Sequence, residues 1–147
     1  RPALAGRAYS LNPLTSSALL AAVLGRAALT VAMRLHSGIL AATAGTPAVV
    51  IDYDTKTRAF AEQTRQLPWL VHVDELEGAQ AAPGRAALTR AILDSLRTEP
   101  ERRAALARAV APLRAEAGRT AALAVQLASA SAARKAPANL VSRAVGR

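Results

Sequence analysis

Residues 29–60, LTVAMRLHSGILAATAGTPAVVIDYDTKTRAF, decide the fold of this chain. They begin with a short apolar run ended by a charge, continue through small residues closed by Gly45 and Pro47, and reach a second apolar run. Short apolar runs are typical of buried parallel strands, and a Gly followed by a Pro marks a helix end. The stretch therefore predicts a tight strand–helix–strand unit.

The rest of the chain extends this unit into an α/β fold. Strands are predicted at residues 29–33, 48–51 and 70–73, with the first two adjacent and parallel. Helices are predicted from Asn12-Pro13 to Gly25, and then over residues 37–44, 57–66, 85–96 and 101–132. The fold class expected is a Rossmann-like, mainly parallel sheet with helices on both faces, ending in long helices.

Three local signals complete the predicted organisation. Residues 78–84 predict a loop, in which Pro83-Gly84 is a turn. Pro112 lies inside the last helical pattern and should kink or split it. Residues 134–147 form a basic tail.

Composition limits the classes of protein to consider. The 147 residues carry a formal net charge of +9, and all but two of the basic residues are arginine. This excess fits either the coding bias of a GC-rich genome or selection for a polyanion or an acidic membrane surface. There is no Cys, so thiolate chemistry is excluded, and no apolar run approaches the ~18 residues of a membrane span. A cytoplasmic protein is expected, either free or at the inner face of the membrane.

Two strand ends carry the chemistry of the chain. The carboxyl ends of neighbouring parallel strands meet at one edge of a sheet, where ligands bind. A helix that starts there directs its first amides at a bound anion, and an arginine adds a planar fork suited to phosphate or carboxylate. The residues at these ends are Arg34, Leu35, His36 and Ser37 after the first strand, and Asp52, Tyr53, Asp54 and Lys56 after the second.

Each of these residues also has a structural interpretation. Arg34 could pair with a carboxylate at the sheet end, and His36 could cap the helix at Ser37. The two aspartates could be ordinary turn carboxylates, with Tyr53 on a rim and Lys56 solvated. His72 alternates with valines in a predicted strand and is interpreted as structural. No His, Cys and carboxylate cluster has the spacing of a metal site.

The ordered set MRLH, GTP and YDTK resembles the polysaccharide pyruvyl transferases. The resemblance covers roughly residues 19–73, and it departs from the family at Thr55, where Pro is common. It implies transfer of pyruvyl from phosphoenolpyruvate to a sugar of a cell-wall or surface polysaccharide, without metal or cofactor. It also implies a GT-B-type enzyme, of which residues 1–147 would be the C-terminal, donor-binding domain and residues 100–147 a helical extension.

Roles for individual residues follow from the resemblance. Arg34, the Leu35 amide, His36 and Ser37 would hold the donor phosphate, with Lys56 as a further anion contact. His36 would be the catalytic acid or base, and residues 52–54 would line the cleft. The partners implied are a polysaccharide or lipid-linked saccharide acceptor and an N-terminal domain, without which the isolated chain should be inactive.

Two other functions stay open. One is the nucleotide-sugar-binding half of another GT-B-type glycosyltransferase. The other is a basic module that binds nucleic acid, against which the low aromatic content of 3 % weighs.

Overall fold

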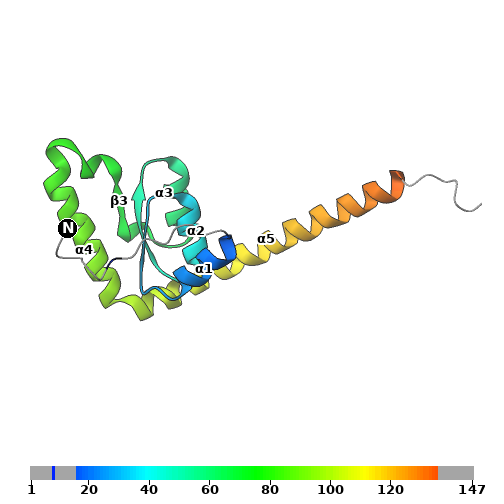
Figure 1. Ribbon diagram of the computed structural model, residues 1–147, viewed down its shortest axis with the longest axis horizontal. Coiled ribbons are helices and arrows are strands. Elements are labelled where there is room, and N and C mark those ends of the chain that lie inside the picture. The colour runs from blue at the N-terminus through cyan, green and yellow to red at the C-terminus, as the bar shows by residue number, and fades with distance from the viewer. Residues whose placement is uncertain (1–7, 9–15, 136–147) are drawn as a thin grey trace, which may run out of the picture. The chain divides into compact units, whose positions relative to one another are not determined.

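The computed structural model describes residue 8 and residues 16–135, and it has a mixed α/β fold (Figure 1). Its described strands are β1 (Thr30–Ala32), β2 (Ala48–Asp52) and β3 (Leu70–His72). The α-helices are α1 (Ser17–Gly25), α2 (Leu35–Thr43), α3 (Thr55–Gln63), α4 (Ala81–Arg97) and α5 (Glu99–Lys135). Short 3-10 turns are η2 (Leu67–Trp69), η3 (Val73–Leu76) and η4 (Gly78–Gln80).

The three described strands form one parallel sheet in the order β1-β2-β3. Ala32 pairs with Val50, and Asp52 pairs with His72. The predicted strands and the adjacent parallel pairing of the first two are therefore confirmed. Because α2 and α3 each connect neighbouring parallel strands, all three strands end at the same edge of the sheet, which we call the carboxyl edge.

Helices lie on both sides of the sheet. Ala32, Ala48 and Val50 point to one face and pack with Ala61 of α3, joined by Phe60 and Leu70 at the margin of this cluster. The helix α4 packs against β2 and β3 and lies on the opposite side of the sheet from α2 and α3 (Figure 1). A core of small and β-branched residues brings these layers close together.

The start of α5 is anchored at the amino end of the sheet by Arg102. This buried side chain donates to the Ala48 carbonyl at 2.8 Å and to Ser95 Oγ, and its guanidinium stacks 3.7 Å from the centroid of the Trp69 ring. Burial lowers the Arg102 pKa to about 10, while the charge of Asp94 acts in the opposite direction. Arg102 is therefore still charged at neutral pH.

Three predicted boundaries are wrong. The helix α2 begins at Leu35 instead of residue 37, because Arg34 already takes the extended N-cap conformation. The helix α3 spans Thr55–Gln63 instead of residues 57–66, because Asp54 caps it. Pro83-Gly84 lies in the first turn of α4, not in a loop turn, and Pro is tolerated there because the first helical N–H groups have no partner within the helix.

The helix α5 runs through Pro112 without a break, so of the predicted kink or split the split is wrong. A proline removes one backbone hydrogen bond, which a helix of 37 residues tolerates. The predicted helix start at Asn12-Pro13 is wrong as well, because the extended Ser16 caps α1, which begins at Ser17. Asn12, Pro13 and the basic tail beyond Lys135 lie outside the described residues.

The chain divides into two units, Arg1–Val110 and Ala111–Arg147. The sheet, α1 to α4 and the start of α5 belong to the first unit, where Leu106 and Val110 pack with Ala42 and Phe60. In the second unit the described part of α5 exposes Leu123, Val125 and Leu127. None of the helices in the described ranges has the length and apolar character needed to cross a membrane.

Candidate functional site

The first strand end presents an open helix N-terminus. Arg34 caps α2 through its backbone alone, with φ −84° and ψ 131° and no side-chain capping bond. Its carbonyl accepts from the Ser37 hydroxyl at 2.6 Å and from the Ser37 amide at 3.0 Å. Within residues 16–135, the backbone N–H groups of Leu35 and His36 have no acceptor. These two amides are available to a bound anion.

The side chains around these amides are also available. Arg34 and His36 are exposed, and neither side chain has a hydrogen-bond or ion-pair partner in the described part of the chain. A paired structural role for Arg34, one of the interpretations of the sequence, therefore has no carboxylate to support it among these residues. A guanidinium, an imidazole and two free amides lie within three consecutive residues.

The second strand end is different, because its helix N-terminus is closed. Asp54 caps α3 by accepting from the backbone N–H groups of Lys56 at 2.6 Å and Thr57 at 3.1 Å. The Asp54 carboxylate thus takes the place that an anion would occupy. Of the two helix starts after β1 and β2, only that of α2 is open to a ligand.

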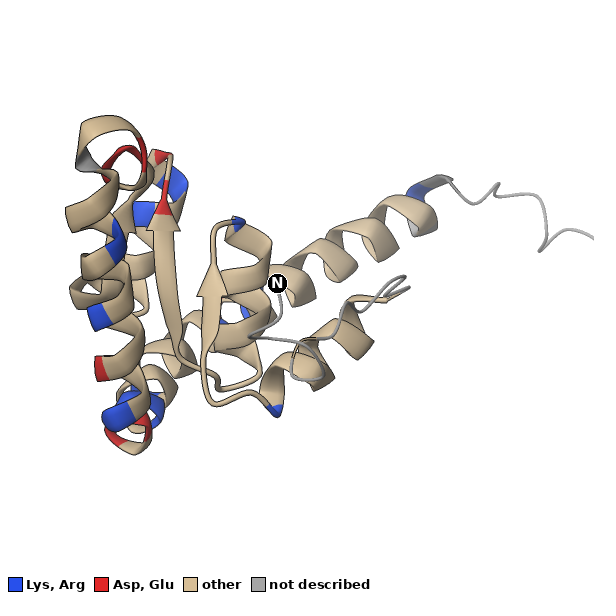
Figure 2. Cartoon of the chain, turned by 60° about the vertical axis from the view of Figure 1, so that its left-hand side comes forward, with Lys and Arg blue, Asp and Glu red and all other residues tan. Residues whose placement is uncertain are grey.

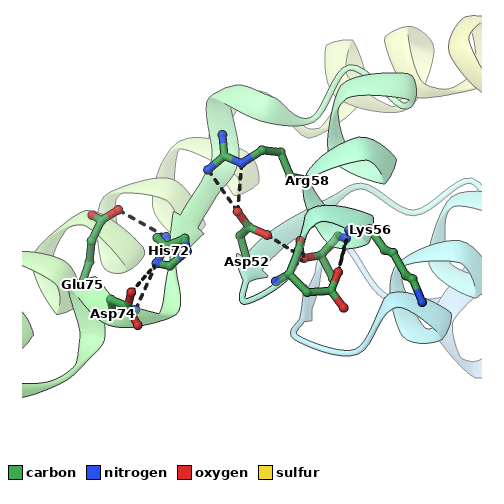
Figure 3. Close-up of polar contacts among 8 residues, drawn as sticks. Asp52, Lys56, Arg58, His72, Asp74 and Glu75 are labelled. Atoms are coloured by element: carbon green, nitrogen blue, oxygen red, sulfur yellow. Dashed lines mark hydrogen bonds and ion pairs between the residues drawn. The ribbon is translucent and has the colours of Figure 1, made fainter.

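Asp52 is buried, with 2 % of its surface exposed, and its two oxygens have different partners. One oxygen accepts from the Thr57 hydroxyl at 2.6 Å, and the other accepts from Arg58 Nε at 3.1 Å and Nη2 at 3.0 Å (Figure 3). Tyr53, the next residue, is exposed. Asp52 therefore organises the start of α3, and both of its oxygens already have partners within the chain.

The sheet register aligns the three strand ends. Asp52 pairs directly with His72, whereas the pairing of β1 with β2 ends at Ala32 and Val50, two residues before Arg34 and Asp52. Neighbouring strands are about 4.8 Å apart, so these backbones follow one another across the carboxyl edge. Figure 2 shows both acidic and basic residues around the strand ends.

The third strand end holds His72 in a tight turn. His72 Nδ1 accepts from the backbone N–H of Asp74 at 3.3 Å and lies 3.4 Å from Asp74 Oδ2. The backbone N–H of His72 donates to Glu75 Oε1 at 3.3 Å. The structural role expected for His72 is present, since its side chain caps η3.

Arg58 and His72 are the residues of this edge that the sequence analysis did not assign to the site. A signal for Arg58 exists in the sequence, because it follows Asp52 by six residues and lies in the first turn of α3. The sequence contains no such signal for His72, because the position of His72 opposite Asp52 depends on the pairing of β2 with β3.

Other features of the described residues do not add to the site. Three described hollows are lined mainly by residues of α4, η2 and the start of α5, and none of these three includes Arg34 or His36. The described residues contain no group of three or more His, Cys, Asp or Glu side chains that could hold a metal ion.

Comparison with known proteins supports one family. Residues 3–55, roughly a third of the chain, match the family model of polysaccharide pyruvyl transferase. The match includes Arg34 to Ser37 and Asp52 to Asp54, and it ends one residue before Lys56. No curated protein and no solved structure matches the chain. The resemblance seen in the sequence motifs is thus confirmed, since the matched residues contain the MRLH and GTP motifs and the first residues of YDTK.

Proposed function

We propose that this chain binds phosphoenolpyruvate as the donor of a pyruvyl transfer to a sugar of a cell-wall or surface polysaccharide. The observation that carries the proposal is the open start of α2, where Arg34, His36 and the free amides of Leu35 and His36 lie inside the region matched by the family model. A phosphate dianion satisfies both the free amides and the unpaired guanidinium.

The proposed chemistry needs positioning and charge stabilisation. The methylene carbon of the donor gains a proton, one acceptor hydroxyl adds to the neighbouring carbon, and phosphate leaves as a second hydroxyl closes the ketal. Arg34 and the two amides would stabilise the phosphate as it leaves. His36 would deliver a proton, either to the methylene carbon or to the departing phosphate.

The surrounding assembly is part of the same proposal. The acceptor would be a polysaccharide or a lipid-linked saccharide, bound mainly by an acceptor-side domain in a GT-B-type arrangement. Transfer would take place in the cytoplasm, in solution or at the inner face of the membrane. Purified residues 1–147 should then bind the donor without transferring pyruvyl, and measurable transfer by these residues alone would refute this part.

Calorimetric titration with phosphoenolpyruvate tests the donor site. Arg34→Ala removes a charged contact that is worth about 1.5–3 kcal/mol, so donor affinity should fall roughly ten- to a hundredfold. Arg34→Lys should restore it only in part, because an ammonium lacks the planar fork. If His36 moves a proton, His36→Ala should lower turnover of the active enzyme more than donor affinity.

Arg97→Ala is a matched control. Arg97 is an exposed arginine near the amino end of β3, so its loss removes the same charge far from the carboxyl edge. Its donor affinity should equal that of the unmodified protein. An equal loss of phosphoenolpyruvate affinity in Arg34→Ala and Arg97→Ala would indicate a general effect of charge and would refute a donor site at the start of α2.

A further inference from the structure

We infer that Arg58 and His72 form a second anion subsite at the carboxyl edge, which takes the carboxylate of the donor. This inference rests on the proposed function, in which Arg34 and the start of α2 take the phosphate. Phosphoenolpyruvate carries two anionic groups, and the α2 start accounts for one of them. The sequence predicts Lys56 as a further anion contact, but the contacts at the strand ends favour Arg58 and His72 instead.

Arg58 is held in place by Asp52 and keeps unused hydrogen-bond donors. Its Nε and Nη2 both donate to one oxygen of the buried Asp52, whose other oxygen is held by Thr57. A guanidinium has five N–H donors, so Nη1 and one hydrogen of Nη2 remain for a ligand. The Arg58 side chain is 55 % exposed, so these donors can be reached. Because Asp52 already orients the fork, a ligand carboxylate would meet a preorganised partner.

His72 adds a second donor in a defined orientation. Since Nδ1 accepts from the Asp74 amide, the neutral ring carries its proton on Nε2. Asp74 Oδ2 also lies on the Nδ1 side of the ring, at 3.4 Å. The Nε2–H group therefore points away from this carboxylate, and the side chain is 39 % exposed.

The sheet register relates the two donors through Asp52. Asp52, which holds Arg58, pairs directly with His72 across β2 and β3. Figure 3 shows the His72 ring and the Arg58 guanidinium next to Asp52, with the Lys56 side chain pointing away from them. Arg34 follows the end of β1, which lies on the other side of β2 from β3, so the two subsites of this proposal lie at the same edge of the sheet.

The acidic groups at this edge are compatible with an anion. Asp52 is paired with Arg58 and buried beneath it. Glu75 accepts from the His72 backbone within the η3 turn, and the exposed Asp74 carboxylate lies on the Nδ1 side of the ring, away from Nε2. The excess donors of Arg58 and the Nε2–H of His72 are the hydrogen-bond donors of this cluster that have no acceptor in the described ranges.

The test compares phosphoenolpyruvate with ethyl phosphate, a phosphate monoester without a carboxylate. Affinities of the purified protein for both are measured by calorimetry, together with Arg58→Ala, His72→Ala and Arg34→Ala. Arg58→Ala and His72→Ala should each weaken phosphoenolpyruvate binding roughly tenfold and leave ethyl phosphate binding unchanged. Arg34→Ala should weaken both ligands, and Arg97→Ala should weaken neither.

Folding is controlled separately, because Arg58→Ala leaves the buried Asp52 without its ion-pair partner. Arg58→Lys keeps the positive charge, and circular dichroism melting shows whether each variant is folded. The Arg58→Lys variant should bind phosphoenolpyruvate more weakly than the unmodified protein, because the ammonium group of lysine cannot hold Asp52 and the ligand at the same time with one planar fork.

The outcomes separate the two claims. Unchanged selectivity for phosphoenolpyruvate over ethyl phosphate in folded Arg58→Lys and His72→Ala would overturn the second subsite and leave the proposed function intact. Unchanged binding of both ligands by Arg34→Ala, or no binding of phosphoenolpyruvate by the unmodified protein, would refute the proposed function and the inference with it.

Discussion

Replacing Gly84 with alanine should destabilise the fold, although alanine is the better helix former. Gly84 is buried in the first turn of α4, and a Cβ atom built there overlaps the backbone carbonyl of Glu75 in η3. The atom that it meets is backbone, so no side-chain rotation removes the overlap. The helix α4 or the η3 turn must shift, and η3 is the turn that holds His72.

The magnitude follows from two opposing effects. Alanine gains about 1 kcal/mol over glycine in a helix interior, whereas overpacking against fixed atoms costs about 3 kcal/mol. The net loss of about 2 kcal/mol should lower the melting temperature of a unit of this size by about 10 °C. Thermal melting followed by far-ultraviolet circular dichroism measures the change.

Gly118→Ala is the matched control for this measurement. Gly118 lies in α5, and a Cβ atom there meets nothing within 4 Å among the described residues. This substitution should leave the melting temperature unchanged or raise it slightly, since only the helix propensity changes. A melting temperature for Gly84→Ala equal to that of Gly118→Ala would refute the close contact between α4 and η3.

Three further substitutions test the contacts that define the fold. Asp54→Ala removes the cap of α3 and should cost about 1 kcal/mol in denaturant unfolding, and an unchanged midpoint would contradict the capping role. Arg102→Ala removes the hydrogen bond to the Ala48 carbonyl and the stacked cation, at about 3 kcal/mol. Arg102→Met should lose about half as much stability as Arg102→Ala, because methionine fills the space of the arginine stem and carries no charge for burial to oppose. Equal losses of stability in the two variants would refute this account. Gly38→Ala should lower the melting temperature by only a few degrees, because its Cβ meets the movable ring edge of Phe60 at 2.8 Å, and a loss as large as that of Gly84→Ala would show that the ring cannot turn.

Local sequence signals were enough for the elements around the site. The apolar runs at residues 29–33 and 48–51 predicted β1 and β2, and the Gly45 and Pro47 signal predicted the end of α2. Such signals depend on neighbours within a few residues, which the sequence shows directly. The MRLH, GTP and YDTK motifs lie at these junctions, and the family match confirms the resemblance over residues 3–55.

The predicted starts of the helices were less accurate where two local sequence signals competed. The sequence predicts helix starts at Ser37 and Thr57, but Arg34 and Asp54 hold the cap positions. Pro83-Gly84 has the composition of a turn and yet opens α4, because Gly84 allows the helix to approach the backbone of Glu75. That approach involves a contact between two elements, which propensity alone cannot represent.

The sequence by itself determined the strand–helix–strand order, the chemical character of the two strand ends and the resemblance of residues 3–55 to one family. Only the tertiary structure decided that the α3 start is closed, that Asp52 is buried beneath Arg58, and that His72 lies opposite Asp52. Arg102 is the clearest example, since its guanidinium donates a hydrogen bond to the carbonyl of Ala48, 54 residues earlier in the chain. The physical reason is that strand register and burial depend on which distant segments pack together, and no short-range periodicity encodes that choice.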